Sequence, residues 1–357
     1  MDLFSPVSLG ELHLPNRVVM APMTRTRSGA SGVPGPLVAE HYAQRASVGL
    51  IITEGTYPSQ ESQSYPGQPG IVTEEQIEGW RSVADAVHAK GGRIVMQLMH
   101  GGRVTHTDIT GTDRVVAPSA IAIDGSTHGP NGKVAYPVPH ALTTEELATV
   151  REQFVTAAKN AFAAGLDGVE LHSANGYLLH QFLSPVSNQR EDAYGQSPQA
   201  RARFVVEVAT AVAEAVGAGR VGIRLSPMHN IQDVFETDLD DVKATYEAVI
   251  DGIAPLGLAY VSLLHADPAS DLVQDLRQRF GAPFIVNSGF AGLTTRDEAI
   301  ALVEGAHADA VAVGRLALAN PDLVERWKGA HPENEPQPAT FYGASAEGYT
   351  DYPRLSA

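Results

Sequence analysis

Short apolar runs rich in β-branched residues alternate with longer helical patterns along the whole chain, and this alternation restricts the fold more than any other feature. Eight runs predict strands: Val18–Met23, Gly49–Glu54, Arg93–Leu98, Gly168–His172, Val221–Ser226, Tyr260–Leu264, Phe284–Asn287 and Ala310–Val313. Eight segments predict helices: Gly35–Ala46, Glu74–Lys90, Thr144–Ala164, Gln199–Ala215, Leu239–Ala254, Asp271–Phe280, Thr295–Val303 and Pro321–Lys328. Continuous apolar runs are typical of parallel strands buried on both faces.

Eight strands that are each followed by a helix favour a closed (β/α)8 TIM barrel, and a doubly wound open sheet is the alternative. No proline-rich linker or change in composition divides the chain, so we predict one domain over residues 1–357. Three segments lie outside the repeat. We expect Phe4–Leu14 to form a hairpin that caps the bottom of the barrel, Thr105–His140 to form a long excursion after the third strand, and the aromatic tail Pro332–Ala357 to be ordered.

Composition restricts the partners. With 25 Lys and Arg against 41 Asp and Glu, the net charge is −16, which repels nucleic acids and anionic membranes. The absence of cysteine excludes disulfides, thiolate metal sites and thiol nucleophiles, and the histidines lack the spacing of metal ligands. The N-terminus resembles no signal peptide, and no apolar stretch reaches the roughly 20 residues of a membrane helix. We therefore expect a cytoplasmic protein without a metal, nucleic-acid or membrane partner.

A barrel of this kind carries its active site at the C-terminal ends of its strands, so the residues there are the candidates. They are Pro22, Met23, Thr24 and Arg25 after the first strand, Gly55 after the second, Gln97 and His100 at the third, His172, Asn175, Gly176 and Tyr177 after the fourth, Arg224 within the fifth, Ser288, Gly289 and Phe290 after the seventh, and Gly314 and Arg315 after the eighth.

The loops after strands seven and eight commonly hold phosphate in such barrels, and here both carry glycine. Arg315 adds a positive charge, so we expect a phosphate there, although Gly289 and Gly314 are also consistent with tight turns. The string Gly217–Gly222 matches G-x-G-x-x-G, but it follows a predicted helix and precedes a strand. That order is the reverse of the dinucleotide-binding context, so this string is a turn.

His172, Asn175 and Tyr177 form the sharpest group of polar residues. His and Asn in one loop can donate hydrogen bonds to a single oxygen, and the tyrosine hydroxyl can act as a general acid. The same residues are equally consistent with a histidine bonded to backbone, an Asn-Gly turn and a packed tyrosine. Arg224 lies inside an apolar strand and requires an anionic partner, which is a structural carboxylate or an anionic cofactor.

At these strand ends the sequence resembles the old yellow enzyme family of FMN-dependent ene-reductases, in its threonine-bearing branch. The matching segments are Ala21–Arg25, His172–Leu178, Phe182–Pro185 with Asn188 to Gly195, Arg201–Phe204, Arg224–Pro227, Asn287–Phe290 and Val313–Arg315, and the likeness extends from the N-terminal hairpin to Gly348–Pro353. Each motif alone is modest, but their order along the chain is highly specific.

The resemblance implies a role for each candidate. Thr24 would bond the flavin carbonyl near N5, Gln97 would hold the pyrimidine edge and Arg224 would lie by N1. Arg315 and the backbone of Gly289, Phe290 and Gly314 would hold the phosphate, and Pro22, Met23, Gly55 and Ser288 would complete the FMN site. His172 and Asn175 would bind the substrate's carbonyl or nitro oxygen, and Tyr177 would protonate its α-carbon. Tyr65, Phe235 and Tyr349 would form the pocket walls, again by resemblance.

The family reaction implies that NADPH, or NADH, and an electron-poor alkene use one site in turn, with ping-pong kinetics. Many relatives carry Trp where this chain has Met99, so the resemblance does not imply reactivity that depends on a bulky residue there, such as attack on nitro groups themselves. A cofactor-free aldolase or isomerase barrel is the competing hypothesis, but the lysines lie in predicted helices and loops rather than at strand ends. A non-catalytic flavin-binding protein is a third. The sequence is compatible with a monomer or a homodimer.

Overall fold

The computed structural model describes residues 1–355, and its centre is a closed barrel of eight parallel strands. The strands are β3 (Val18–Met20), β4 (Leu50–Ile52), β5 (Ile94–Leu98), β10 (Gly168–Ser173), β11 (Val221–Leu225), β12 (Tyr260–Leu264), β13 (Phe284–Asn287) and β14 (Ala310–Val313). They pair in chain order, and β14 closes the barrel on β3. The predicted (β/α)8 barrel is confirmed, and the doubly wound alternative is wrong.

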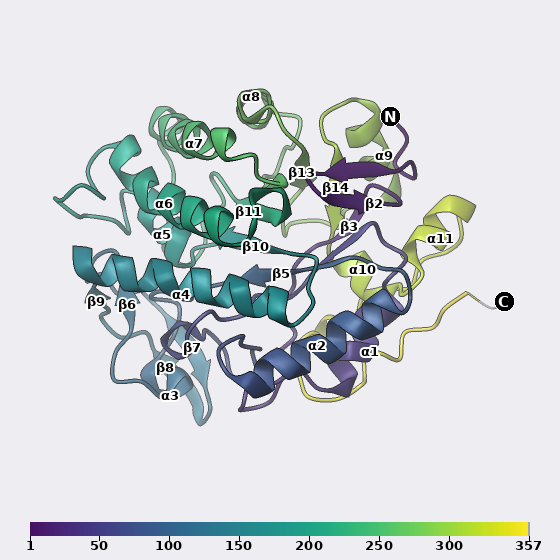
Figure 1. The fold of residues 1–357 in the computed structure, drawn as a ribbon, viewed down its shortest axis with the longest axis horizontal. Helices are drawn as coiled ribbons and strands as arrows, with labels where there is room; N and C mark the ends of the chain where they lie inside the picture. The colour runs from purple at the N-terminus through teal and green to yellow at the C-terminus, as the bar shows by residue number, and fades with distance from the viewer. Residues whose placement is uncertain (356–357) are drawn as a thin grey trace.

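Helices surround the barrel, as Figure 1 shows. They are α1 (Pro36–Gln44), α2 (Glu74–His88), α4 (Thr144–Ala163), α6 (Pro198–Val216), α7 (Leu239–Ile253), α8 (Asp271–Phe280), α9 (Arg296–Glu304) and α11 (Leu323–Gly329). The start of α4 follows from a capping box, in which Thr143 accepts the Glu146 N–H and Glu146 accepts the Thr143 N–H. The sequence did not predict three short helices, α3 (Thr107–Thr110), α5 (Leu178–Leu183) and α10 (Arg315–Ala319).

The hydrophobic core has a larger part between the barrel and its helices and a smaller part that fills the lower barrel. A separate small cluster consists of Met99, Val104, Ile123 and Tyr177. Strands β1 (Val7–Leu9) and β2 (Leu12–Leu14) form the expected antiparallel hairpin, and Leu9, Leu12 and Leu14 pack into the smaller part. These leucines close the bottom of the barrel.

The excursion after β5 contains α3 (Thr107–Thr110) and four short strands: β6 (Val116–Ala117), β7 (Ser126–Gly129), β8 (Gly132–Ala135) and β9 (His140–Ala141). Strands β7 and β8 form a hairpin, and Figure 1 shows it on the side of the barrel away from β1 and β2. The Gly217–Gly222 string lies between α6 and β11 and contains a 3-10 turn over Ala218–Arg220, which confirms the predicted turn. Further 3-10 turns are Gln60–Ser62, Ala254–Leu256 and Pro338–Thr340.

The tail after α11 runs along the outside of α1 and ends near α11 in Figure 1. It is ordered over the described residues, as predicted, and Tyr349 and Tyr352 are buried. The last two residues of the predicted segment lie outside the described part of the chain. Among residues 1–355, no helix is long and apolar enough to cross a membrane.

Candidate active site

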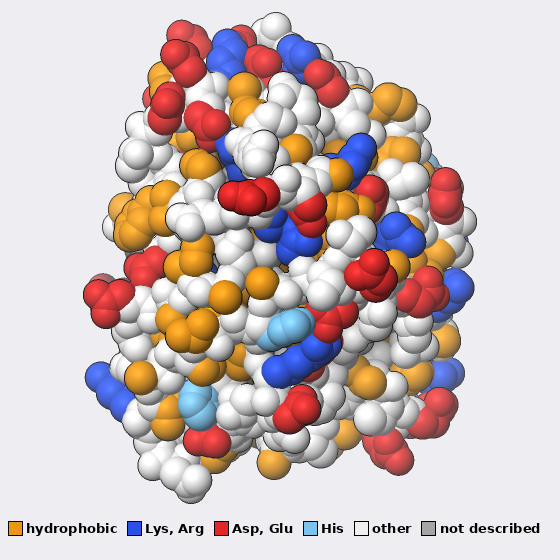
Figure 2. Space-filling model, turned by 90° about the vertical axis from the view of Figure 1, so that its left-hand side faces the viewer, with side chains coloured by type: hydrophobic (Ala, Val, Ile, Leu, Met, Phe, Trp, Pro, Cys, Tyr) orange, Lys and Arg blue, Asp and Glu red, His pale blue; other side chains and the backbone are white. Residues whose placement is uncertain are grey.

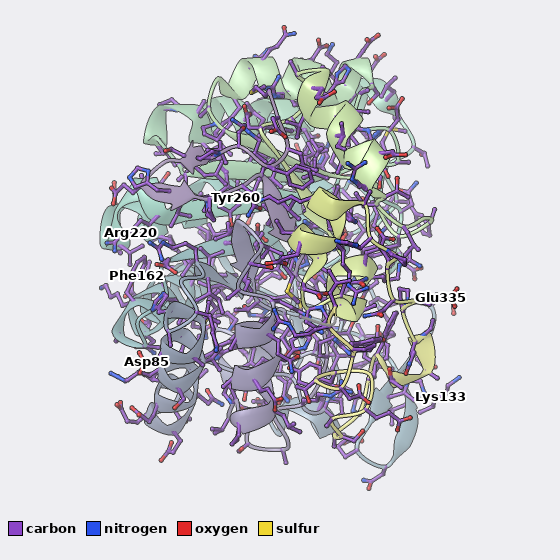
Figure 3. The ribbon with its side chains drawn as sticks, turned by 90° about the vertical axis from the view of Figure 1, so that its right-hand side faces the viewer. Asp85, Lys133, Phe162, Arg220, Tyr260 and Glu335 are labelled. Carbon is purple, nitrogen blue, oxygen red and sulfur yellow. The ribbon has the colours of Figure 1, made fainter. Side chains whose placement is uncertain are left out.

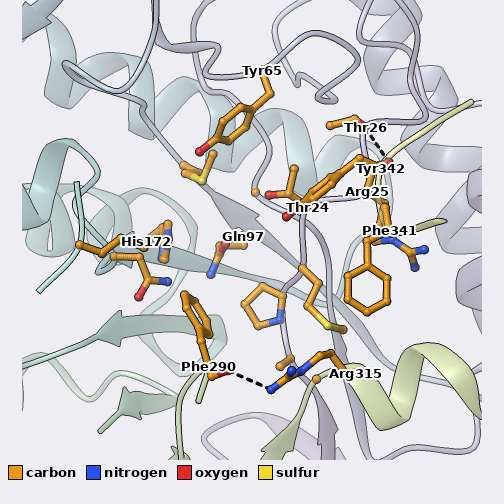
Figure 4. Close-up of a pocket in the computed structure, with 18 of the residues that line it drawn as sticks. Thr24, Arg25, Thr26, Tyr65, Gln97, His172, Phe290, Arg315, Phe341 and Tyr342 are labelled. Atoms are coloured by element: carbon orange, nitrogen blue, oxygen red, sulfur yellow. Dashed lines mark hydrogen bonds between the residues drawn. The ribbon is translucent and has the colours of Figure 1, made fainter. Parts of the chain in front are cut away.

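A cavity of about 960 Å³ opens at the C-terminal ends of the strands. It is large for a ligand pocket, since such pockets are typically about 300–1,000 Å³. The structure brings nearly all the predicted residues to its wall: Pro22, Met23, Thr24, Gly55, Tyr65, Gln97, His172, Asn175, Tyr177, Arg224, Gly289, Phe290, Gly314 and Arg315. Figure 4 shows several of these residues converging from different strands. On the molecular face that Figure 2 shows, acidic, basic and hydrophobic side chains are intermixed.

Two of the predicted pocket walls are wrong. Tyr349 is fully buried away from the cavity, where its ring stacks on His41 at a centroid distance of 3.9 Å. Phe235 is 44% exposed and lies outside the cavity wall, because its loop turns Ile231 and Gln232 toward the cavity instead. Ser288 lies beside the wall, where its hydroxyl bonds that of Thr294 at 3.2 Å, and its role in holding a cofactor stays a prediction.

The tail contributes Phe341 and Tyr342 to the cavity, and the sequence analysis missed both. Arg25 explains how they reach it. The buried Arg25 guanidinium donates to the carbonyl oxygens of Phe341 and Gly348, both at 2.9 Å, and Arg27 donates to the carbonyls of Thr340, Ser345 and Glu347. The only signal in the sequence was an aromatic pair in a tail that we expected to be ordered.

Backbone constraints fix the loop after β10. Asn175 adopts a left-handed conformation with φ 56°, and its backbone N–H donates to the Ser226 hydroxyl at 2.9 Å. The Gly176 N–H donates to His180 Nδ1 at 2.9 Å. Strained conformations of this kind persist where the surroundings hold them, and they are concentrated at functional sites. Here the constraint turns Asn175 and Tyr177 toward the same cavity as His172.

Unused hydrogen-bonding groups remain in this loop. Burial holds the pKa of His172 well below its ordinary value, and the nearby Arg224 charge acts in the same direction, so the imidazole is neutral. Its Nδ1 and the Asn175 Oδ1 are buried without a partner among residues 1–355. With its proton on Nε2, the imidazole can bind one acceptor oxygen together with the Asn175 amide.

Tyr177 is paired with a second tyrosine. Its hydroxyl lies 2.8 Å from the Tyr65 hydroxyl, and its ring is tilted against His172 at a centroid distance of 5.2 Å. Burial raises the pKa of Tyr177 to about 12, while hydrogen bonds with Tyr65 and Gln232 act in the opposite direction. Tyr177 therefore keeps its proton at neutral pH, and neighbouring polar groups can stabilise the phenolate that proton donation leaves.

The floor of the cavity carries Gln97 and Arg224. Gln97 Nε2 donates to Glu170 Oε1 at 2.8 Å, and Arg224 Nη1 donates to the Ser262 hydroxyl at 3.1 Å. Arg224 Nε has no partner among the described residues. The sequence left open whether a structural carboxylate or a cofactor balances Arg224. Glu170 on the neighbouring strand β10 is a buried carboxylate, and it is the main charge that opposes the lowering of the Arg224 pKa by burial.

The loops after β13 and β14 meet at one side of the cavity. Arg315 Nη2 donates to the Phe290 carbonyl at 3.0 Å and to the carbonyl of Gly292, which joins the two loops. Gly289 has φ 92°, a conformation that L side chains rarely adopt. The remaining guanidinium N–H groups of Arg315 are available for an anion. Among residues 1–355, no group of three or more His, Cys, Asp or Glu could hold a metal ion.

Met99 lines the cavity, and a glycine makes room for it. A Cβ atom on Gly55 would lie 2.5 Å from Met99 Sδ, so a larger residue at position 55 would displace the methionine. The β7–β8 hairpin adds His128 and Gly129 to the mouth of the cavity. Residues from a segment after β5 therefore enclose a site whose floor comes from the strands.

Comparison with known proteins identifies the family. Residues 2–334 match the model of the NADH:flavin oxidoreductase / NADH oxidase family. The chain belongs to this family. Within the NADH:flavin oxidoreductases it is 42% identical to a probable flavin mononucleotide-dependent alkene reductase of Leishmania infantum, over 98% of this chain and 97% of that protein. It is 40% identical to 12-oxophytodienoate reductase 1 of Oryza sativa subsp. japonica, over 99% and 93% of the two chains.

Solved structures of NADH:flavin oxidoreductases superpose on the whole chain. The old yellow enzyme homologue from Zymomonas mobilis has a TM-score of 0.94 at 36% identity, and the match covers 99% of this chain and all of that one. Morphinone reductase has a TM-score of 0.92 at 41% identity, with 99% and 96% covered. The expected old yellow enzyme family is therefore confirmed, and this chain is an oxidoreductase of that family.

Proposed function

We propose that the protein is an FMN-dependent ene-reductase that takes hydride from NADPH or NADH and delivers it to the β-carbon of an electron-poor alkene. Enones, enals, maleimides, quinones and nitroalkenes form the substrate class. The observation that carries the proposal is the convergence of His172, Asn175 and the Tyr177 hydroxyl on one cavity whose floor holds Gln97 and Arg224. The similarity to an alkene reductase and to a 12-oxophytodienoate reductase supports it.

The polar groups of the cavity fit FMN. A flavin has hydrogen-bonding groups along its pyrimidine edge, which suit Gln97 and the unpaired Nε of Arg224. Its phosphate suits Arg315 and the glycine-containing loops at Gly289 and Gly314. Thr24 lines the cavity near Gln97, as Figure 4 shows, and its hydroxyl is suited to a flavin carbonyl. When bound, FMN supplies the acceptance and release of hydride.

The substrate is held by its activating oxygen. His172 and Asn175 donate hydrogen bonds to the carbonyl or nitro oxygen, and these bonds strengthen as negative charge develops there during hydride transfer. The neutral state of His172 matters, because a buried imidazolium would add a charge that burial disfavours. Phenols bind as inhibitors because their oxygen presents negative charge to the same two donors.

Tyr177 completes the reaction. Its hydroxyl donates a proton to the α-carbon, and the resulting phenolate accepts a hydrogen bond from the Tyr65 hydroxyl at 2.8 Å. Burial favours the protonated form of Tyr177, so the proton is present whenever a substrate arrives. Because the nicotinamide and the alkene occupy the same cavity in turn, the kinetics are ping-pong. The protein acts as a monomer or a homodimer on small molecules.

The visible spectrum of the purified protein tests this proposal. Flavin absorption bands that bleach with NADPH under anaerobic conditions and return on addition of cyclohexenone are expected. Repeating the titration with NADH identifies the preferred donor. A colourless protein that binds no added FMN would overturn the proposal and favour the cofactor-free barrel enzymes.

A further inference from the structure

A buried glutamate lies directly beneath the cavity, and the proposed chemistry does not use it. Glu170 is on β10, two residues before His172, so both side chains point to the same face of that strand, with Glu170 one layer deeper. It is completely buried. One carboxylate oxygen accepts the Gln97 amide at 2.8 Å, and the other has no hydrogen-bond partner among residues 1–355. A buried carboxylate in this state requires an explanation.

Arg224 provides part of the explanation. Gly222 pairs with Glu170 in the register of β10 and β11, and Arg224 follows two residues later, so its side chain points to the same inner face of the barrel as that of Glu170. Burial raises the pKa of Glu170, and Arg224 is the main charge that lowers it. Burial lowers the pKa of Arg224, and Glu170 is the main charge that raises it. Each residue therefore makes the charged state of the other less costly inside the barrel.

A glycine beside Glu170 makes room for a tyrosine inside the barrel. Gly222 lies opposite Glu170 in the pairing of β10 with β11, and Tyr260 lies opposite Gly222 in the next pairing. A Cβ atom on Gly222 would lie 2.2 Å from Tyr260 Cζ, so the tyrosine ring passes over the glycine inside the barrel, among the strands in Figure 3. Burial and the nearby Glu170 carboxylate both raise the pKa of Tyr260, whose hydroxyl has no hydrogen-bond partner among residues 1–355.

We propose that Glu170 is a positioning residue that sets the reduction potential of bound FMN through Arg224 and fixes the orientation of Gln97. This inference depends on the proposed FMN site. A carboxylate can only accept hydrogen bonds, so Gln97 must direct its NH₂ group toward Glu170. Its Oε1 then faces the cavity, where it accepts from an N–H group on the pyrimidine edge of the flavin.

The effect on the potential has a definite sign. A flavin gains negative charge on reduction, and Arg224 favours that charge. The Glu170 carboxylate offsets part of the Arg224 charge, so it disfavours the reduced state and keeps the potential low. The protein thereby retains FMN as a strong hydride donor to the alkene.

The substitution Glu170→Gln removes the charge and preserves the shape, and the midpoint potential of bound FMN measures the result. We expect a rise that corresponds to about a tenfold change in the equilibrium constant for reduction, or about 30 mV for a two-electron couple. The Kd for FMN should increase as well, because Gln97 is no longer held in one orientation. A potential that is unchanged or lower would overturn the inference.

Two control variants separate charge from packing. Ser262→Ala removes a hydrogen bond of Arg224 without changing any charge, and Glu236→Gln alters a buried glutamate that bonds His180 at 3.2 Å. Neither should raise the potential as Glu170→Gln does, and an equal rise in either would overturn the inference.

A third variant covers the case in which Glu170→Gln fails to retain FMN. Glu170→Asp keeps the charge, so weaker FMN binding at a nearly unchanged potential is expected, whereas a tenfold effect on reduction would count against the proposal. Wild-type protein that binds no FMN would overturn the proposed function and this role together. Wild-type protein with FMN and an unaltered Glu170→Gln potential would overturn this role alone.

Discussion

The Tyr177→Phe substitution tests the proposed proton donor. It keeps the ring that packs near His172 and removes only the hydroxyl that bonds Tyr65 at 2.8 Å. A positioned general acid contributes roughly 100- to 10,000-fold to a rate. Because the Tyr65 hydroxyl remains beside the same position, a second proton source survives in the variant. We therefore expect the lower part of this range, a loss of about 100- to 1,000-fold in alkene reduction.

The assay separates the two halves of the reaction. In anaerobic stopped-flow experiments, NADPH should bleach the flavin of Tyr177→Phe at nearly the wild-type rate, since hydride donation to FMN needs no proton from this residue. Reoxidation by cyclohexenone should carry the whole loss. Equal loss in both half-reactions would refute the proton-donor role and indicate that Tyr177 only shapes the cavity.

The pH dependence provides an independent check on the same residue. Burial raises the pKa of Tyr177 to about 12, so the acid is protonated below that pH and is lost only above it. The wild-type rate of reoxidation by an alkene should therefore show no decrease from Tyr177 across roughly pH 6 to 9. The matched variant Tyr65→Phe leaves the Tyr177 hydroxyl in place, so it should slow reoxidation less than Tyr177→Phe does.

Two further predictions concern the phosphate site and the catalytic loop. Arg315→Ala should weaken FMN binding by tenfold or more, because it removes the cation beside Phe290 and Gly292. The Kd is measured by flavin fluorescence during dilution, and an unchanged Kd would place the phosphate elsewhere. His180→Phe should lower the free energy of unfolding by about 1–3 kcal/mol in urea denaturation, because the buried Glu236 carboxylate loses the hydrogen bond from the imidazole. An unchanged free energy of unfolding would contradict that account.

The amino-acid sequence determined the barrel and most of its site. Short apolar runs that alternate with helical patterns specify parallel strands with external helices. A closed barrel brings the ends of all its strands together. For this reason residues as distant in the chain as Thr24, Gln97, His172 and Arg315 could be assigned to one cavity from their positions after strands. The bottom hairpin followed from the same logic, because its leucines needed an apolar surface to cover.

Only the tertiary structure decided which loop and tail residues face the cavity. Loop direction depends on contacts with distant segments, such as the bonds from Arg25 that bring Phe341 to the cavity and leave Tyr349 stacked on His41. The local sequence does not indicate such contacts. Tyr349 was therefore predicted to line the cavity, whereas Tyr342 lines it in the structure. The sequence did not indicate a role for the Glu170 carboxylate, for a related reason. Inside a continuous apolar strand, only the packing of neighbouring strands shows which cation it faces.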